Sequence, residues 1–249
     1  MKKKILSLLQ ILLLGVSLFF GYKAYQELKP LWNINASNSA LKSLAVVEKE
    51  NPFDRKIDFK ALKEVNQDII GWVYIPDTNV DYPIFKGQTD EEYLFKDINN
   101  EYNRLGSVTT FSDTDSSFNK GQNFIYAHNG VKDMMFGNLI HYTEKEFREN
   151  HPVFYVYTET KTYECPIFSI FIADEIEEIY NHDFEIASIQ HISRVNELID
   201  RNSYDDLEKQ DLDSFTNSEV FTLLTCYGGI GTPNRLLING SVSKIKYIL

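Results

Sequence analysis

Residues 220–229 read Val-Phe-Thr-Leu-Leu-Thr-Cys-Tyr-Gly-Gly, and residues 234–238 read Asn-Arg-Leu-Leu-Ile. The first run is apolar and β-rich and ends on Cys226, and the glycines that follow let another backbone come close. The second β-rich run begins with Arg235, nine positions after the cysteine. The pattern predicts two neighbouring strands that hold a thiol at a strand end with a cation beside it.

His128 is the candidate partner for this thiol. A free cysteine has a pKa near ~8.5 and is only a few per cent ionised at neutral pH, so a catalytic thiol needs a base or a cation nearby. Among the five histidines, His128 ends the apolar run 123–128, and Asn129 and Gly130 provide a turn directly after it. The sequence therefore predicts one cysteine and one histidine at two strand ends.

These residues resemble the sortases, the membrane-anchored cysteine transpeptidases of Gram-positive bacteria. The sortase pattern has Thr-Leu-x-Thr-Cys, an arginine on the next strand and a histidine well upstream, which Cys226, Arg235 and His128 match. Further segments, spread over roughly residues 55–245, follow the order of class B sortases: Gly-Trp-Val-Tyr-Ile-Pro at 71–76, Asp-Tyr-Pro-Ile at 81–84, Glu-Tyr-Leu at 92–94, Tyr-Ala-His-Asn at 126–129 and Met-Phe-Gly-Asn-Leu at 135–139.

The resemblance implies a substrate protein whose C-terminal sorting signal carries a Pro- and Thr-containing pentapeptide that is cleaved after the threonine. Cys226 would form the acyl-enzyme, His128 would transfer protons, and Arg235 would stabilise the oxyanion. The acceptor would be an amine of a cell-wall precursor. Two alternatives share these residues: an endopeptidase with water as the acceptor, and an inactive, membrane-tethered binding module.

Four further residues are predicted to bind the substrate. Tyr126 lies two residues before His128, so strand alternation places both side chains on one face. Two positions depart from class B: Leu224, where serine is frequent, and Tyr227, where a polar or acidic residue is frequent. The predicted substrate-binding residues are Leu94, Tyr126, Thr225 and Tyr227.

The N-terminus predicts a membrane anchor. Three lysines at 2–4 precede an uncharged run at 5–22, which is close to the shortest length that spans a bilayer. A cleaved signal peptide is the alternative, but the run exceeds a usual h-region and no small-x-small site follows promptly. Because lysines favour the cytoplasmic side, we expect residues 1–30 to be a cytoplasmic lysine cluster with a single-pass signal anchor. Residues 31–249 would then be an extracytoplasmic stalk and sortase catalytic domain.

Composition limits the classes of protein and the partners that fit this chain. The 249 residues are 43% hydrophobic and 14% aromatic, which excludes general disorder, and the net charge of −11 argues against a nucleic-acid partner. The two cysteines, Cys165 and Cys226, suggest either a disulfide or, as the apolar strand pattern around Cys165 favours, an inert core thiol.

Strand patterns predict an α+β fold, a closed barrel of about eight strands with peripheral helices. We expect a helix at 58–66 capped by Asp58, a stalk at 33–40 followed by a helix at 41–50, and a structured connection at 174–219 that contains a helix. The expected strands are 69–75, 82–85, 106–111, 122–128, 153–157, 162–173, 220–226 and 235–244.

No metal or other cofactor is predicted. Residues 113–118 superficially suggest a calcium loop, but Phe118 stands where glycine is needed and Phe124 where a bidentate glutamate belongs. The histidines outside the proposed site have no tight metal-ligand spacing: these are His141, His151, His182 and His191.

Overall fold

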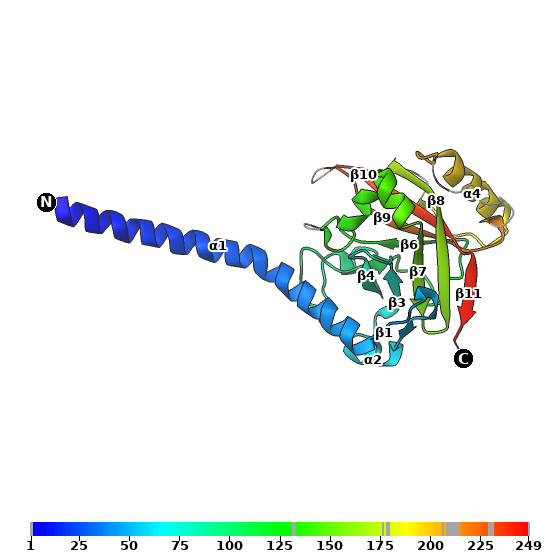
Figure 1. The fold of residues 1–249 in the computed structure, drawn as a ribbon, viewed down its shortest axis with the longest axis horizontal. Coiled ribbons are helices and arrows are strands. Elements are labelled where there is room, and N and C mark those ends of the chain that lie inside the picture. The colour runs from blue at the N-terminus through cyan, green and yellow to red at the C-terminus, as the bar shows by residue number, and fades with distance from the viewer. Residues whose placement is uncertain are drawn as a thin grey trace. The chain divides into compact units, whose positions relative to one another are not determined.

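The computed structural model describes residues 2–130, 133–175, 177, 180–205, 207, 215–228 and 232–248. The chain divides into two compact units, Met1–Ala40 and Leu41–Leu249. Helix α1, Lys2–Ala45, begins in the first unit and ends in the second (Figure 1). By its length and composition, α1 could cross a membrane.

Residues 33–40, where a stalk is predicted, belong to α1, which continues through them without a break. Residues 31–45 contain no glycine or proline, and asparagine or serine in a helix costs less than about 0.7 kcal/mol relative to alanine. In the second unit, Leu41 and Ala45 are buried in a cluster with Phe59 and Leu62, which stabilises the last turns. The helix also stops earlier than the predicted residue 50.

The end of α1 is set by strand pairing. Directly after Ala45, strand β1 (Val46–Val47) pairs antiparallel with β2 (Lys56–Ile57). Helix α2, Phe59–Val65, confirms the predicted helix and its cap: the Asp58 carboxylate accepts from the Ala61 N–H at 3.0 Å. A short 3₁₀ helix, η1, occupies Pro52–Asp54 between these elements.

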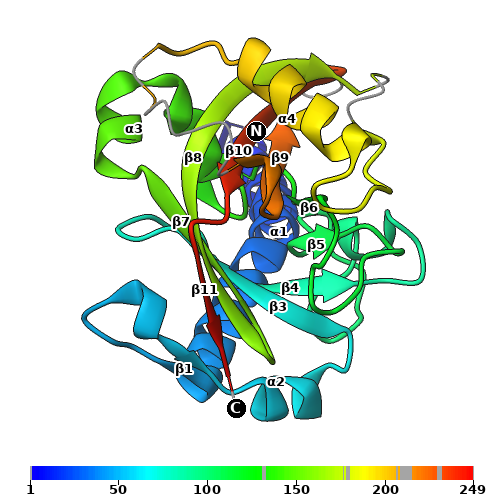
Figure 2. The ribbon, with the colours of Figure 1, turned by 90° about the vertical axis from the view of Figure 1, so that its right-hand side faces the viewer.

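Eight strands close into a barrel, which confirms the predicted fold (Figure 2). The pairing order is β10-β9-β6-β5-β4-β3-β7-β8, and β8 pairs back onto β10. Strand β8 is long enough to pair with β7 through its first half and with β10 through its second. The strands are β3 (Ile69–Tyr74), β4 (Asp81–Lys86), β5 (Thr109–Thr110), β6 (Gln122–Tyr126), β7 (Val153–Thr158), β8 (Lys161–Asp174), β9 (Val220–Cys226) and β10 (Asn234–Ser241).

Two strand predictions need correction. The strand expected at 106–111 shrinks to β5, because Gly106 has φ +56° and the N–H of Ser107 bonds to Tyr93 instead of a barrel neighbour. The strand expected at 235–244 is two strands, β10 and β11 (Lys244–Tyr247). The strand is interrupted because its two parts pair with different parts of β8. Strand β10 pairs with the second half of β8, whereas β11 pairs with residues 161–164 at the start of β8.

Helices and 3₁₀ turns cover the barrel. The connection after β8 contains α4, as predicted, and α4 buries Val195 and Leu198 against residues of β6, β8, β9 and β10. The other elements are η2 (Glu92–Leu94), η4 (Gly137–Thr143), α3 (Lys145–Asn150) and α4 (Ile189–Asp200).

His191 of α4 is 0% exposed. Its Nδ1 accepts from the Ala187 N–H at 3.0 Å, and its Nε2 has no partner among the described residues. Burial lowers the pKa of His191. The imidazole is therefore held in its neutral form where α4 begins.

This burial predicts an acid-sensitive stability. As pH falls below about 6.5, the unfolded chain takes up the His191 proton first, so the free energy of unfolding decreases toward the lower folded-state pKa. His191→Gln should flatten that dependence, since glutamine does not titrate. Urea unfolding of wild type and variant at about pH 7.5 and about pH 5.5 measures it. Equal pH slopes for the two proteins would contradict the assignment.

Candidate active site

Three adjacent strands carry the three candidate catalytic residues. Cys226 is the last residue of β9, and Arg235 in β10 is its direct partner in the antiparallel register. His128 follows β6, two residues beyond Tyr126, whose register partner is Leu224 of β9. Since β6 and β9 run parallel, their carboxyl ends meet at one edge of the barrel, where β10 begins.

Contacts beyond the strand ends keep the His128 segment beside Cys226. The Ala127 N–H donates to the Leu224 carbonyl at 3.3 Å, and the Thr225 hydroxyl donates to the Ala127 carbonyl at 3.0 Å. The Asn129 amide donates to the Cys226 carbonyl at 3.2 Å. Hydrogen bonds therefore link the two segments up to the position of the thiol.

The two cysteines differ in environment. Both are free: Cys226 is half-buried at its strand end, whereas Cys165 is 0% exposed. Burial raises the pKa of Cys165 well above its ordinary value, which suppresses the reactive thiolate. The structure confirms the prediction of a core thiol at Cys165 and leaves Cys226 as the accessible one.

The His128 ring is fixed by a backbone acceptor. Its Nε2 lies 3.0 Å from the Leu94 carbonyl oxygen, and its ring centroid lies 5.6 Å from that of Phe95. A carbonyl only accepts, so Nε2 carries the hydrogen and the neutral ring presents its lone pair at Nδ1. Burial lowers the pKa of His128, the Leu94 carbonyl raises it, and the positive charge of Arg235 lowers it. The pKa of His128 is lowered overall, so the neutral form of the ring predominates at pH 7.

An NMR titration checks this electrostatic balance. We expect the pKa of His128 to lie below the ordinary value of about 6.5. Arg235→Gln should raise it, because the variant removes a nearby positive charge. Lys246→Gln is a matched control, because Lys246 is paired with Asp54. A His128 pKa unchanged in Arg235→Gln would show that the two side chains are not electrostatically coupled.

Arg235 is held by three acceptors. One terminal nitrogen, Nη1, donates to the carbonyls of Thr232 at 3.0 Å and Asn234 at 3.1 Å. The other, Nη2, forms an ion pair with the Glu175 carboxylate. The side chain of Arg235 is 20% exposed and that of Glu175 is 48% exposed.

A pocket of about 360 Å³ opens beside Arg235, and neither Cys226 nor His128 is among its lining residues. Its wall is aromatic and aliphatic, and it carries three carboxylates against the single guanidinium of Arg235. Its lining is Asp90, Glu91, Leu94, Phe111, Tyr126, Glu175, Tyr180, Leu224 and Arg235.

The four predicted substrate-binding residues occupy different places. Leu94 and Tyr126 line the pocket, and the Tyr126 hydroxyl donates to the Asp90 carbonyl at 2.6 Å. Thr225 is buried, and its hydroxyl donates to the Ala127 carbonyl. The backbone N–H of Tyr227 donates to the Asn234 carbonyl at 2.9 Å. Neither Thr225 nor Tyr227 lines the pocket. Substrate contact by these two residues stays a prediction.

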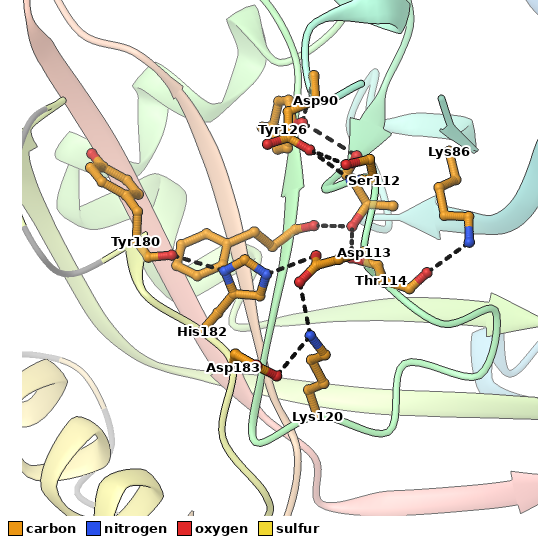
Figure 3. A network of polar contacts seen from close by, with 12 residues as sticks. Lys86, Asp90, Ser112, Asp113, Thr114, Lys120, Tyr126, Tyr180, His182 and Asp183 are labelled. Carbon is orange, nitrogen blue, oxygen red and sulfur yellow. Dashed lines mark hydrogen bonds and ion pairs between the residues drawn. The ribbon is translucent and has the colours of Figure 1, made fainter. Parts of the chain in front are cut away.

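One side of the pocket is anchored by a polar network (Figure 3). The His182 ring stacks on Phe111 with centroids 4.4 Å apart, and its Nε2 lies 3.0 Å from Asp113 Oδ1. Asp113 also pairs with Lys120 at 3.0 Å, and the Asp90 carboxylate accepts from Ser112. These contacts tie the connection after β8 to the segment between β5 and β6.

Six pocket residues were missed by the sequence analysis. Glu175 follows the long β8 strand directly, and that polar position after a strand end was a usable signal. Leu224 was noted only as a departure from class B, although strand alternation places it on the same face as Cys226. The other four face the pocket because distant segments meet there, and no local pattern identifies them. The missed residues are Asp90, Glu91, Phe111, Glu175, Tyr180 and Leu224.

Comparison with known proteins identifies the family. Residues 73–243 match the sortase domain. Sortase B of Staphylococcus aureus is 24% identical over 98% of this chain and 99% of its own length, and sortase B of Listeria monocytogenes is 29% identical over 66% and 68%. The structure of sortase B from B. anthracis in complex with AAEK1 superposes with a TM-score of 0.72, at 23% identity, covering 87% of this chain and 99% of that one.

The chain therefore belongs to the sortase family of cysteine transpeptidases. The curated relatives are class B sortases, and they confirm the predicted class.

Proposed function

We propose that this sortase cleaves a C-terminal sorting signal after threonine and transfers the protein to an amine of a cell-wall precursor. The observation that carries the proposal is the register pair Cys226–Arg235, with His128 two residues beyond the end of the adjacent parallel strand β6. A nucleophile, a proton carrier and a fixed cation at one barrel edge suit acyl transfer through a covalent intermediate.

In the first half-reaction, the Cys226 sulfur attacks the threonine carbonyl and forms a C–S bond while the peptide C–N bond breaks. Nδ1 of His128, the basic nitrogen in the neutral ring, takes the proton of the Cys226 thiol and then gives it to the leaving amine. Arg235 donates to the oxygen that becomes negatively charged in the transition state. In the second half-reaction, the acceptor amine attacks the thioester, gives its proton to His128, and releases the thiolate.

The substrate is proposed to occupy the 360 Å³ pocket. Leu94 and Tyr126 would contact the peptide from the lining, and Thr225 and Tyr227 would act from either side of Cys226. The clients would be surface proteins that carry a sorting signal. The pocket's apolar wall is consistent with a peptide whose proline and aliphatic parts pack against aromatic rings.

A peptide-library screen tests the reaction. The enzyme is incubated with pentapeptide-containing substrates, with and without an amine nucleophile, and the products are read by mass spectrometry. Cleavage after threonine with a ligated amine product supports transpeptidation. Cleavage with water as the sole acceptor would indicate the endopeptidase, and uncleaved peptides with an unreactive Cys226 would indicate a binding module.

Membrane topology gives a separate prediction. The apolar α1 helix behind a lysine cluster is proposed as a single-pass anchor with a cytoplasmic N-terminus and an extracytoplasmic catalytic domain. After removal of the wall, external protease should digest the domain in intact cells. A fragment that starts near Leu31 should be soluble and active. A released mature protein whose N-terminus lies near residue 25 would instead indicate a cleaved signal peptide.

A further inference from the structure

Glu175 occupies a fixed place next to Arg235. It directly follows β8, which flanks β10 on the side opposite to β9. Asp174 is the register partner of Asn234, and the Glu175 N–H donates to the Pro233 carbonyl at 2.9 Å. The backbone of Glu175 is therefore held against the start of the strand that carries Arg235.

The Glu175 carboxylate is the charged member of the three acceptors that hold the guanidinium. The carbonyls of Thr232 and Asn234 accept from Nη1, and Glu175 accepts from Nη2. Charge-assisted hydrogen bonds are roughly twice as strong as neutral ones, so Glu175 contributes most to the orientation of the planar group. A guanidinium has more N–H donors than these contacts use, and the remaining donors are available to a substrate carbonyl.

Competing carboxylates make this contact important. Asp90 and Glu91 line the same pocket as Arg235, and both are exposed. Without Glu175, these carboxylates would attract the guanidinium across the pocket. The contribution of the Glu175–Arg235 pair to folding should be small, because exposed ion pairs stabilise a protein little.

We propose that Glu175 is a positioning residue for Arg235. Its carboxylate holds the guanidinium plane so that the unused N–H donors point at the carbonyl oxygen of the scissile bond. The inference rests on the proposed function, since it assigns Arg235 to the oxyanion. Glu175 itself contacts no reacting atom in this scheme and acts through Arg235.

Kinetics on the full-length chain in detergent micelles test the proposal. Glu175→Ala should lower kcat for acyl-enzyme formation about 10- to 100-fold, because small misplacements of a catalytic group have effects of this size. KM should change much less, and Glu175→Gln should retain part of the rate through its oxygen acceptor. Glu177→Gln is the matched control: Glu177 lies on the same segment but pairs with Arg201, and this variant should keep wild-type kinetics.

A double-mutant cycle separates positioning from a structural role. If Glu175 acts by orienting the planar guanidinium of Arg235, Glu175→Ala should reduce the rate of acyl-enzyme formation little further in an Arg235→Lys background. Thermal midpoints of the Glu175 variants should match that of Glu177→Gln, and alkylation of Cys226 by a small reagent should stay at the wild-type rate. Fully additive losses would overturn the proposal. Faster acylation by Glu175→Ala would also overturn it, since Glu175 would then be restraining Arg235.

An activity-independent measurement distinguishes failure of this inference from failure of the proposed function. Removing the Glu175 charge frees the Arg235 guanidinium to move, so the pKa of His128, which Arg235 influences, should change in Glu175→Gln. An unchanged His128 pKa would show that Glu175 does not hold the guanidinium in place. A wild-type enzyme that never acylates, together with this pKa change, would refute the proposed reaction while leaving the Glu175–Arg235 arrangement intact.

Discussion

Cys226→Ala is expected to abolish cleavage of sorting-signal peptides, with a loss on the order of 10⁴-fold or more, as for other removed nucleophiles. In the proposed reaction the acyl-enzyme forms on the Cys226 sulfur, and the other cysteine, Cys165, is fully buried. The fold should persist, because a half-buried thiol at a strand end contributes modestly to packing. Peptide cleavage followed by mass spectrometry, with circular dichroism on the same samples, measures both effects.

Cys165→Ala is the matched control for the nucleophile. Its thiol is 0% exposed and its pKa is raised by burial, so this variant should retain most of the activity. Substantial turnover by Cys226→Ala would refute the assignment. A disulfide between Cys165 and Cys226 in the active protein would refute it as well.

Arg235→Lys is expected to slow acyl-enzyme formation by ~10²- to 10³-fold, the usual effect of losing one oxyanion contact. Lysine keeps the positive charge but lacks the planar fork, which at Arg235 is fixed by two carbonyls and the Glu175 carboxylate. The loss should fall on the chemical step. Single-turnover kinetics with a fluorogenic peptide would measure it, and a small alkylating reagent should still react with Cys226.

Comparison of two Arg235 variants separates the effect of the planar guanidinium from the effect of its positive charge. If only positive charge matters, Arg235→Lys would show near-wild-type kinetics while Arg235→Ala would not. If Arg235→Ala also keeps near-wild-type kinetics, the residue has no part in the mechanism. The proposed geometry predicts large losses for both.

The sequence was most informative where local pattern and long-range structure agree. Strand β9 has the predicted bounds, because an apolar, β-rich run ends at Cys226 and glycines follow it in the sequence. The register of β10 follows from the short connection, which permits little besides an antiparallel return. Helix α2 was predictable because Asp58 caps an amphipathic run with Phe59 and Leu62 on the buried side.

Features that depend on distant partners were not predictable in the same way. Strand β5 consists of two residues held by β4 and β6, whereas the local sequence predicted a longer strand at 106–111. The role proposed for Glu175 depends on β8 pairing with β10, two segments about sixty residues apart in sequence. The helical path of α1 through 33–40 was missed because asparagine and serine suggested a linker, whereas no residue there breaks a helix.

Intact-protein mass spectrometry of the enzyme with a sorting-signal peptide tests the central claim most directly. We predict a mass increase equal to the N-terminal fragment ending in threonine, mapped to Cys226 and sensitive to hydroxylamine as a thioester. Addition of an amine acceptor should discharge it and yield the ligated product. Peptide cleavage without any adduct on Cys226, in a quenched time course that resolves single turnovers, would contradict the covalent mechanism.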